Sequence, residues 1–101
     1  MKSIAFIIPW IGKFPNYFEL WLESCRFNLS IDFLVFTDDH TEYNYPKNVI
    51  LHYMSFENMK SLFQKKYDFP LKIDAPYKFC DFRPAFGEIF AKYLTKYDYW
   101  G

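Results

Sequence analysis

The sequence predicts an α/β fold: a mostly parallel open sheet with flanking helices, formed by residues 1–101 as a single domain. Residues 4–8 and 31–37 are short, continuous apolar runs, which are typical of strands covered on both faces. Between these runs, apolar side chains recur at helical spacing, so that strand and helix alternate along the chain. With 51% hydrophobic and 25% aromatic residues, the chain is too apolar to be disordered.

Local signals place the first two helices and the third strand. The first helix is expected to begin near Pro15. Amide hydrogens in the first turn of a helix have no hydrogen-bond partner within the helix, so proline, which has no amide hydrogen, fits there. Residues 49–54 are predicted to be a third strand, and Ser55 is a suitable cap for a second helix after it. The apolar faces expected for the two helices are Phe18, Trp21, Leu22 and Cys25, and Phe56, Met59 and Phe63.

The last third of the chain is predicted to contain a loop, a helix and a strand. Residues 68–81 include two prolines and are predicted to be mostly loop. Pro84 is expected to begin an amphipathic helix, with an apolar face of Phe86, Ile89, Phe90, Tyr93 and Leu94. Residues 97–100 open a last strand, which we expect beside the first strand, where it would reverse the strand order and create a switch point.

Charge and cysteine content argue against several classes of function. Twelve basic and twelve acidic residues cancel, so no overall field attracts nucleic acid. Cys25 and Cys80 form no paired motif, which favours a reduced, cytoplasmic setting. His40 and His52 lack further ligands at the spacing of a zinc site. The apolar run at residues 4–8 is far shorter than the ~20 residues that span a membrane, so we predict no transmembrane segment.

An acidic pair, Asp38-Asp39, directly follows the second predicted strand. Side chains just past the carboxyl end of a parallel strand face the ligand crevice of such sheets. A carboxylate there can accept hydrogen bonds from a ribose or a base, or help to hold a divalent cation. The alternative is a turn, because aspartate is common after strands and bonds to its own backbone. For an isolated pair the turn is favoured, and both interpretations remain open.

Lys78, Asp81 and Arg83 precede the predicted helix start at Pro84. The free amides and positive dipole of a helix amino terminus favour a phosphate. Arg83 can grip a diphosphate through its planar fork, and Lys78 can add a point charge. Asp81 would repel phosphate and suits a sugar hydroxyl. The alternative is a surface ion pair between Asp81 and Arg83.

Pro9, Trp10 and Gly12 follow the first predicted strand, at the same edge of the sheet. Gly12 would let a ligand approach the backbone, and Trp10 is placed to stack on a base or a sugar. The alternative is that Trp10 is a loop aromatic packed on the first helix. The sequence contains no glycine-rich phosphate loop, serine-nucleophile elbow or zinc-protease motif.

Four segments, in chain order, resemble a bacterial family of glycosyltransferases found in gene clusters for capsule, O-antigen and other surface polysaccharides. They are Ile7 to Phe18, Phe36 to Asp39, Tyr77 to Gly87 and Tyr97 to Gly101. The resemblance thus covers the whole chain. It implies a more distant similarity to GT-A enzymes, whose first half is a Rossmann-like sheet that binds a nucleotide sugar.

The resemblance implies that the intact protein transfers a sugar from a nucleotide-sugar donor to a glycan or lipid-linked acceptor. It would do so in the cytoplasm or at the inner face of the plasma membrane, with peripheral membrane association left open. The donor-binding residues expected are Pro9, Trp10, Gly12, Asp38, Asp39, Lys78, Asp81 and Arg83.

The resemblance also implies a metal ion. In such enzymes an Asp-x-Asp motif that follows a strand holds Mn²⁺ or Mg²⁺, and the Trp-Gly pair leads into it. This chain ends at Trp100-Gly101, before that motif. We therefore expect the truncated nucleotide-sugar-binding half of a GT-A-like enzyme, an incomplete domain that holds no metal and is inactive alone.

Two alternatives belong to other classes. The chain could be a non-enzymatic nucleotide- or sugar-binding module, complete as given. It could also be an inactive truncated product that exposes the apolar face of its last helix and associates. Nucleotide binding by a metal-free monomer would indicate the module, whereas association in size-exclusion chromatography would indicate the truncated product.

Overall fold

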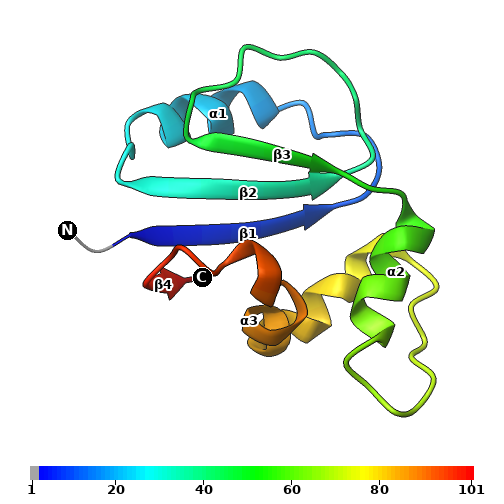
Figure 1. Ribbon diagram of the computed structural model, residues 1–101. Coiled ribbons are helices and arrows are strands. Elements are labelled where there is room, and N and C mark those ends of the chain that lie inside the picture. Colours follow the sequence, from blue (N-terminus) through cyan, green and yellow to red (C-terminus); the bar gives the residue numbers. More distant parts are fainter. Residues whose placement is uncertain (1–2) are drawn as a thin grey trace.

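Four strands form a single parallel sheet in the computed structural model, which describes residues 3–101. Their bounds are Ile4–Trp10 (β1), Ile31–Thr37 (β2), Val49–Tyr53 (β3) and Tyr99–Trp100 (β4). The spatial order is β3-β2-β1-β4, and each pair is parallel (Figure 1). The predicted α/β class is confirmed, because the fold is a Rossmann-like open sheet with flanking helices.

The strand order reverses at β1, as the sequence predicted. The chain passes from β1 to β2 to β3 in one direction and then returns to place β4 against the other edge of β1, with Trp100 opposite Ala5. Backbone hydrogen bonds extend this pairing: Gly101 N donates to Ala5 O (2.8 Å), and Ile7 N donates to Gly101 O (2.9 Å). The strand order therefore reverses between β1 and β4, and sheets of this kind bind ligands beyond the carboxyl ends of the strands at such a switch point.

Helices lie on both faces of the sheet (Figure 1). α1 (Phe18–Arg26) packs on one face, over β2 and β3. The other face is covered by α2 (Phe56–Gln64) and by the short helices η1 (Pro76–Ala85), α3 (Phe86–Ile89) and η2 (Ala91–Tyr93). Within residues 3–101 no helix is long and apolar enough to cross a membrane.

The two longer helices begin for different local reasons. α1 begins at Phe18 and not at Pro15, whose carbonyl instead accepts a hydrogen bond from Phe18 N (3.0 Å). The predicted cap of α2 is confirmed, because Ser55 Oγ accepts a hydrogen bond from Asn58 N (3.0 Å). Most of the predicted apolar positions are buried, namely Phe18, Leu22 and Cys25 in α1, and Met59 and Phe63 in α2.

β1 extends beyond its predicted end and includes Pro9 and Trp10. Proline is normally excluded from a central strand, because it has no N–H to donate. Along a strand, the backbone groups of every second residue point to the same side. The backbone groups of Ala5 and Ile7 form hydrogen bonds on the side of β1 where β4 lies. The nitrogen of Pro9 therefore points to that side as well. Among the described residues, β4 lies opposite Ile4 and Ala5, and no strand lies opposite Pro9 on that side.

The prediction of one amphipathic helix from Pro84 is wrong. Residues 76–85, part of which was predicted to be loop, form the 3₁₀ helix η1, and α3 spans only 4 residues. Pro76 and Pro84 lack amide hydrogens and Gly87 is a poor helix former, so one continuous α-helix does not propagate. The expected burial nevertheless holds for Phe86, Ile89 and Phe90, with Tyr93 and Leu94 packed against them.

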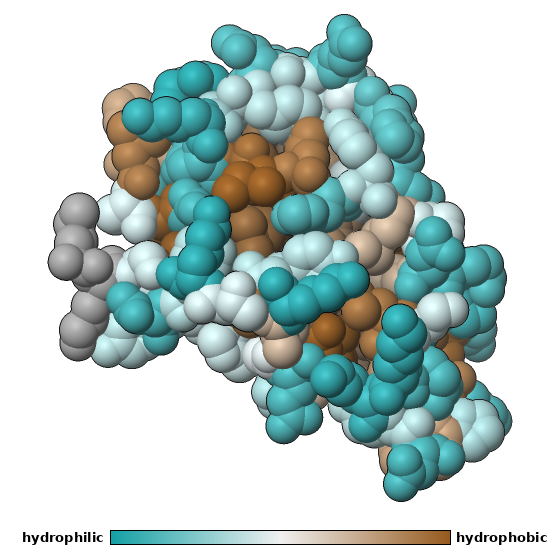
Figure 2. All heavy atoms as spheres, viewed as in Figure 1, coloured by the Kyte–Doolittle hydropathy of each residue, from teal (hydrophilic) through white to brown (hydrophobic). Residues whose placement is uncertain are grey.

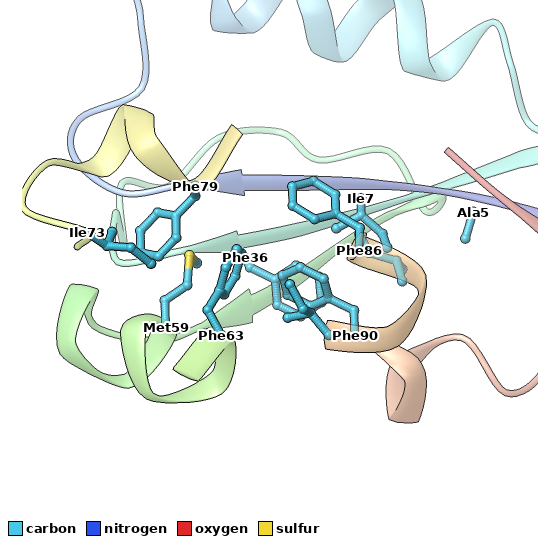
Figure 3. Packing of buried hydrophobic residues seen from close by; sticks show 11 residues of the cluster. Ala5, Ile7, Phe36, Met59, Phe63, Ile73, Phe79, Phe86 and Phe90 are labelled. Atoms are coloured by element: carbon cyan, nitrogen blue, oxygen red, sulfur yellow. The ribbon is translucent and has the colours of Figure 1, made fainter. Parts of the chain in front are cut away.

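Phenylalanine forms most of the core. Eight of the 13 Phe residues are buried. Five of them meet between the sheet and the α2 to α3 segment (Figure 3): Phe36, Phe63, Phe79, Phe86 and Phe90. Several pairs cross edge to face, the geometry that aromatic rings prefer.

Tryptophan and tyrosine lie nearer the surface. In the described residues none of them is fully buried. Figure 2 shows hydrophilic side chains over much of one face, with hydrophobic residues in a hollow over the strands. The aromatic excess therefore divides into a phenylalanine core and accessible tryptophan and tyrosine rings.

Gly87 of α3 lies where the ring of Trp100 crosses the helix. A Cβ atom at position 87 would lie 2.6 Å from a ring carbon of Trp100, so alanine must displace the indole. We expect Gly87→Ala to lower the free energy of unfolding by about 1 kcal/mol, despite the better helix propensity of alanine. Tryptophan emission should shift to longer wavelength. Glu88→Ala, at the next and exposed position, is the control, and a stabilised Gly87→Ala protein would contradict this packing.

Candidate functional site

Gly12 and Asp38 meet at the carboxyl ends of β1 and β2. Gly12 N donates a hydrogen bond to Asp38 Oδ1 at 2.8 Å. The φ angle of Gly12 is +106°, a conformation that L side chains rarely adopt, and nothing lies within 4 Å of the place where its Cβ would be. The other carboxylate oxygen of Asp38 makes no hydrogen bond within residues 3–101, and the residue is exposed. The two predicted residues thus lie together, with one carboxylate oxygen available to a ligand.

Asp39 holds two loops together. Its Oδ2 accepts from Phe14 N (2.8 Å), and its Oδ1 accepts from Thr41 N (2.9 Å) and Thr41 Oγ1 (2.6 Å). The Thr41 hydroxyl lowers the pKa of Asp39 most, and the Phe14 and Thr41 amides and the Lys13 charge add to this, whereas partial burial opposes it. Both oxygens of this ionised carboxylate are therefore occupied, so the turn interpretation describes the geometry of Asp39.

Trp10 lies at the end of β1, where its indole Nε1 donates to Lys13 O (3.1 Å) and its side chain is 37% exposed. It borders a cavity of about 180 Å³ between β1 and the start of α1. We call this cavity the aromatic pocket, and its aromatic walls are Trp10, Phe14, Tyr17, Phe18 and Trp21. The proposed packing of Trp10 near the first helix and its proposed access to a ligand are therefore compatible. Pro9 lies in β1 and does not line the pocket.

Lys78, Asp81 and Arg83 all lie in η1, which packs on β1 (Figure 3). Lys78 Nζ forms an ion pair with Asp74 Oδ1 at 2.6 Å, and this hydrogen bond raises the pKa of Lys78. The guanidinium of Arg83 lies over the ring of Phe86, 5.8 Å from its centroid. Asp81 is exposed and makes no ion pair or hydrogen bond in the described part of the chain, so the alternative Asp81–Arg83 pair is not formed there.

The helix amino terminus expected at Pro84 is absent, which corrects the basis of the predicted phosphate site. Pro84 lies inside η1, and α3 follows without a free first turn. Backbone amides and a helix dipole therefore do not add to binding at this place. Any diphosphate contact in this segment depends on the side chains of Lys78 and Arg83.

The sequence did not reveal a stacked pair at the same edge of the sheet. The rings of His40 and Tyr53 lie 4.0 Å apart at an interplanar angle of 16°, beyond β2 and at the end of β3. Both residues are exposed. The only signal for this pair is the parallel register, which places Thr37 opposite Tyr53 and is not visible in a linear sequence.

The described residues do not fit the divalent cation that the resemblance implies. No group of three histidine, cysteine, aspartate or glutamate side chains in residues 3–101 is arranged to hold a metal ion. Asp39 directs both oxygens to N–H and O–H donors, and Asp38 directs one to Gly12. We therefore derive no step of a mechanism through a metal ion held by these residues.

Comparison with known proteins adds one match. Residues 6–101 match the model of a family described as a family of unknown function (DUF6625). Comparisons with curated proteins and with solved structures found no match. The family match covers the sheet from the third residue of β1 onward, all of the helices, and both loops at the carboxyl ends of β1 and β2.

Proposed function

We propose a function for this chain, which belongs to the DUF6625 family of unknown function: it forms the donor-binding part of a glycosyltransferase. The intact enzyme would transfer a sugar from a nucleotide-sugar donor to a glycan or lipid-linked acceptor during synthesis of a surface polysaccharide. The proposal combines the resemblance of the four sequence segments with the geometry at the carboxyl edge of the sheet.

One observation carries the proposal. The strand order reverses between β1 and β4, and Gly12 meets Asp38 at the carboxyl ends of the central strands beside that reversal. Open parallel sheets bind nucleotides outside such a switch point. The uncovered backbone at Gly12 permits close approach of a ligand, which a side chain would obstruct.

The nucleoside would bind at the loops after β1 and β2. The exposed oxygen of Asp38 can accept a hydrogen bond from a ribose hydroxyl or a base N–H. Asp39 supports this site indirectly, because it holds the loop that follows Gly12. Trp10 offers an exposed ring at the same strand end, and Pro9 precedes it in β1.

The diphosphate and the donor sugar would contact side chains of η1. Arg83 can form a bidentate contact with phosphate oxygens, and its guanidinium lies over the Phe86 ring with no ion pair within residues 3–101. A phosphate would replace Asp74 as the partner of Lys78 or share Lys78 with it. The cost in free energy would be small, because ion pairs at an exposed surface contribute little to stability. Asp81 is available to a sugar hydroxyl.

Calorimetric titration of the intact protein with UDP, GDP and their sugar conjugates tests the proposal. We expect at least one nucleoside diphosphate to bind, and we expect MnCl₂ or MgCl₂ to strengthen that binding only through ligands of the intact enzyme that residues 3–101 do not supply. Binding that is indifferent to the cation would favour the non-enzymatic module. If none of the nucleotides binds with or without cation, the proposal is wrong.

Asp38→Asn tests the proposed nucleoside contact. We expect about a tenfold loss of affinity for the nucleotide that binds, which corresponds to ~1.4 kcal/mol, because the amide lacks one acceptor oxygen and the charge. The melting temperature should change little, since only one exposed hydrogen bond to Gly12 is altered. Asp68→Asn makes the same change at an exposed loop position and is the control. Lost stability with unchanged affinity would show that Asp38 only shapes the turn.

A further inference from the structure

The aromatic pocket is separate from the proposed donor site and shares only Trp10 with it. It opens beside β1 on the face of the sheet that carries α1, whereas η1 lies on the opposite face. Trp10 and Phe14 line it from the end of β1 and the following loop, and Tyr17 and Trp21 line it from the beginning of α1. A ligand there would touch neither Lys78 nor Arg83.

The walls of the pocket are held in place before any ligand arrives. Phe14 and Phe18 stack at 3.9 Å with nearly parallel rings, and Phe18 and Trp21 stack at 5.4 Å. The indole of Trp10 is fixed by its hydrogen bond to Lys13 O. A site built from rings that are already ordered loses little conformational entropy when it binds.

The chemistry of the walls favours an uncharged ligand with an apolar face. None of the residues that line the pocket carries a charge, and the surface of the pocket is almost entirely apolar. The hydroxyl of Tyr17 and the indole N–H of Trp21 make no hydrogen bond within residues 3–101, so neither group is already paired. A pyranose ring meets these conditions, because its C–H groups are attracted to the negative face of an aromatic ring and its hydroxyls can pair with polar groups.

The pocket has room for about one ring of a ligand, and it is partly open to solvent. Pockets for drug-sized ligands measure about 300–1,000 Å³, and this one measures about 180 Å³. A complete nucleotide sugar is therefore too large to lie inside the pocket. A base of the donor is also disfavoured, because it would bring its diphosphate to walls that carry no positive charge.

We propose that the aromatic pocket binds one uncharged sugar ring of the glycan acceptor. The acceptor role rests on the proposed transferase function, whereas the sugar site itself rests only on the pocket. Trp10 borders both sites, but the pocket lies on the face of α1 and η1 lies on the other face, so a ring held between Trp10 and Trp21 lies near the nucleoside end of the proposed donor. The pocket would therefore hold a sugar of the acceptor glycan other than the one that reacts.

Tryptophan indole N–H signals in NMR spectra of the intact protein give a direct test. The probes are the methyl glycosides of glucose, galactose, N-acetylglucosamine and rhamnose, titrated separately to saturation, with UDP as a separate ligand. We expect at least one glycoside to bind with millimolar affinity and to shift the signals of Trp10 and Trp21. The signal of Trp100 should not move, because its ring lies on α3 at the opposite face.

Variants separate the sugar site from the donor site. Tyr17→Ala removes a wall residue that is 64% exposed, and we expect roughly 2- to 12-fold weaker glycoside binding with unchanged affinity for UDP. Trp21→Phe, which keeps an apolar ring but removes the indole N–H, should also weaken it. Tyr77→Ala removes a similarly exposed tyrosine (72%) from η1 and should have no effect on glycoside binding.

Each outcome decides the inference. If no glycoside shifts Trp21, or if Tyr77→Ala weakens binding as much as Tyr17→Ala, the sugar site does not exist. If UDP alone shifts Trp21 strongly, the pocket belongs to the base and the inference is wrong. If a glycoside binds at Trp21 but no nucleotide binds anywhere, the sugar site stands and the transferase function fails.

Discussion

Replacing Asn48 by aspartate is expected to lower the free energy of unfolding by about 3–5 kcal/mol, the range for an uncompensated buried charge. Asn48 is 3% exposed and precedes β3. Its side-chain Nδ2 donates to three carbonyl oxygens: Cys25 O at 2.9 Å, Asn28 O at 3.1 Å and Ile31 O at 2.9 Å. This one amide therefore links the end of α1, the following loop and the beginning of β2.

Aspartate has the same shape but removes the donor. Its carboxylate would face three carbonyl oxygens without a hydrogen to offer, and Oδ1 of Asn48 already has no partner in the described residues. The introduced carboxyl should have a pKa raised above its ordinary value, because burial and the carbonyl dipoles disfavour its charge. The penalty should therefore grow as the pH rises above about 4 and shrink in acid, where a neutral carboxyl can donate one hydrogen bond.

Urea unfolding at several pH values measures this effect. Asn44→Asp is the matched control, because Asn44 is an exposed asparagine in the loop that leads to Asn48. We expect the control to change stability by less than ~0.5 kcal/mol. Equal losses in the two variants, or a loss at Asn48 that does not depend on pH, would contradict the buried donor role.

The regular part of the fold was predictable because local signals determine it. The apolar run at residues 31–37 is a strand that lies between two others, and Ser55 begins α2 because its hydroxyl satisfies an amide that the helix leaves free. The place of β4 followed from topology, since a chain that has crossed the sheet can pair with the other edge of β1. Periodicity and connection rules are properties that a sequence carries by itself.

The segment from η1 to η2 shows where such signals stop. The spacing of Phe86, Ile89 and Phe90 correctly predicted their burial, because the core requires apolar groups at those places. It did not predict the break into short helices. Gly87 accommodates the ring of Trp100, a contact that no local pattern contains.

The candidate site shows the same limit. Asp38 and Asp39 are neighbouring, chemically identical residues, yet one contacts Gly12 and the other contacts Phe14 and Thr41. The sequence could place both carboxylates at the edge of the sheet. Which one keeps an oxygen available depends on how the loop after β1 lies against β2, and this is a tertiary contact.

Asp39→Asn is expected to lower the free energy of unfolding by about 1.5–3 kcal/mol, the range for hydrogen bonds to a charged group, and to loosen the loop after β1. The amide can accept at one oxygen only, so its NH₂ group must face either Phe14 N–H or the amide and hydroxyl of Thr41. One loop therefore loses its anchor. Asp38→Asn is the matched control, because it makes the same substitution at the neighbouring residue and alters one exposed hydrogen bond.

The effect of Asp39 should depend on pH in one direction. Because its pKa is lowered in the folded protein, the carboxylate stabilises the fold above the unfolded-state pKa, about 3.9, and this contribution is lost as the pH falls through the folded-state value. The difference in the free energy of unfolding between the wild-type protein and Asp39→Asn should thus be largest at neutral pH and disappear in acid.

The loosened loop should also be visible at the aromatic pocket. Phe14, whose amide Asp39 holds, stacks on Phe18, and Lys13 accepts the indole hydrogen bond of Trp10. In Asp39→Asn the indole signal of Trp10 should therefore broaden or move, while that of Trp100 keeps its position. If Asp39→Asn is as stable as Asp38→Asn at neutral pH and the Trp10 signal is unchanged, the two loops are held by other contacts and Asp39 does not anchor the site.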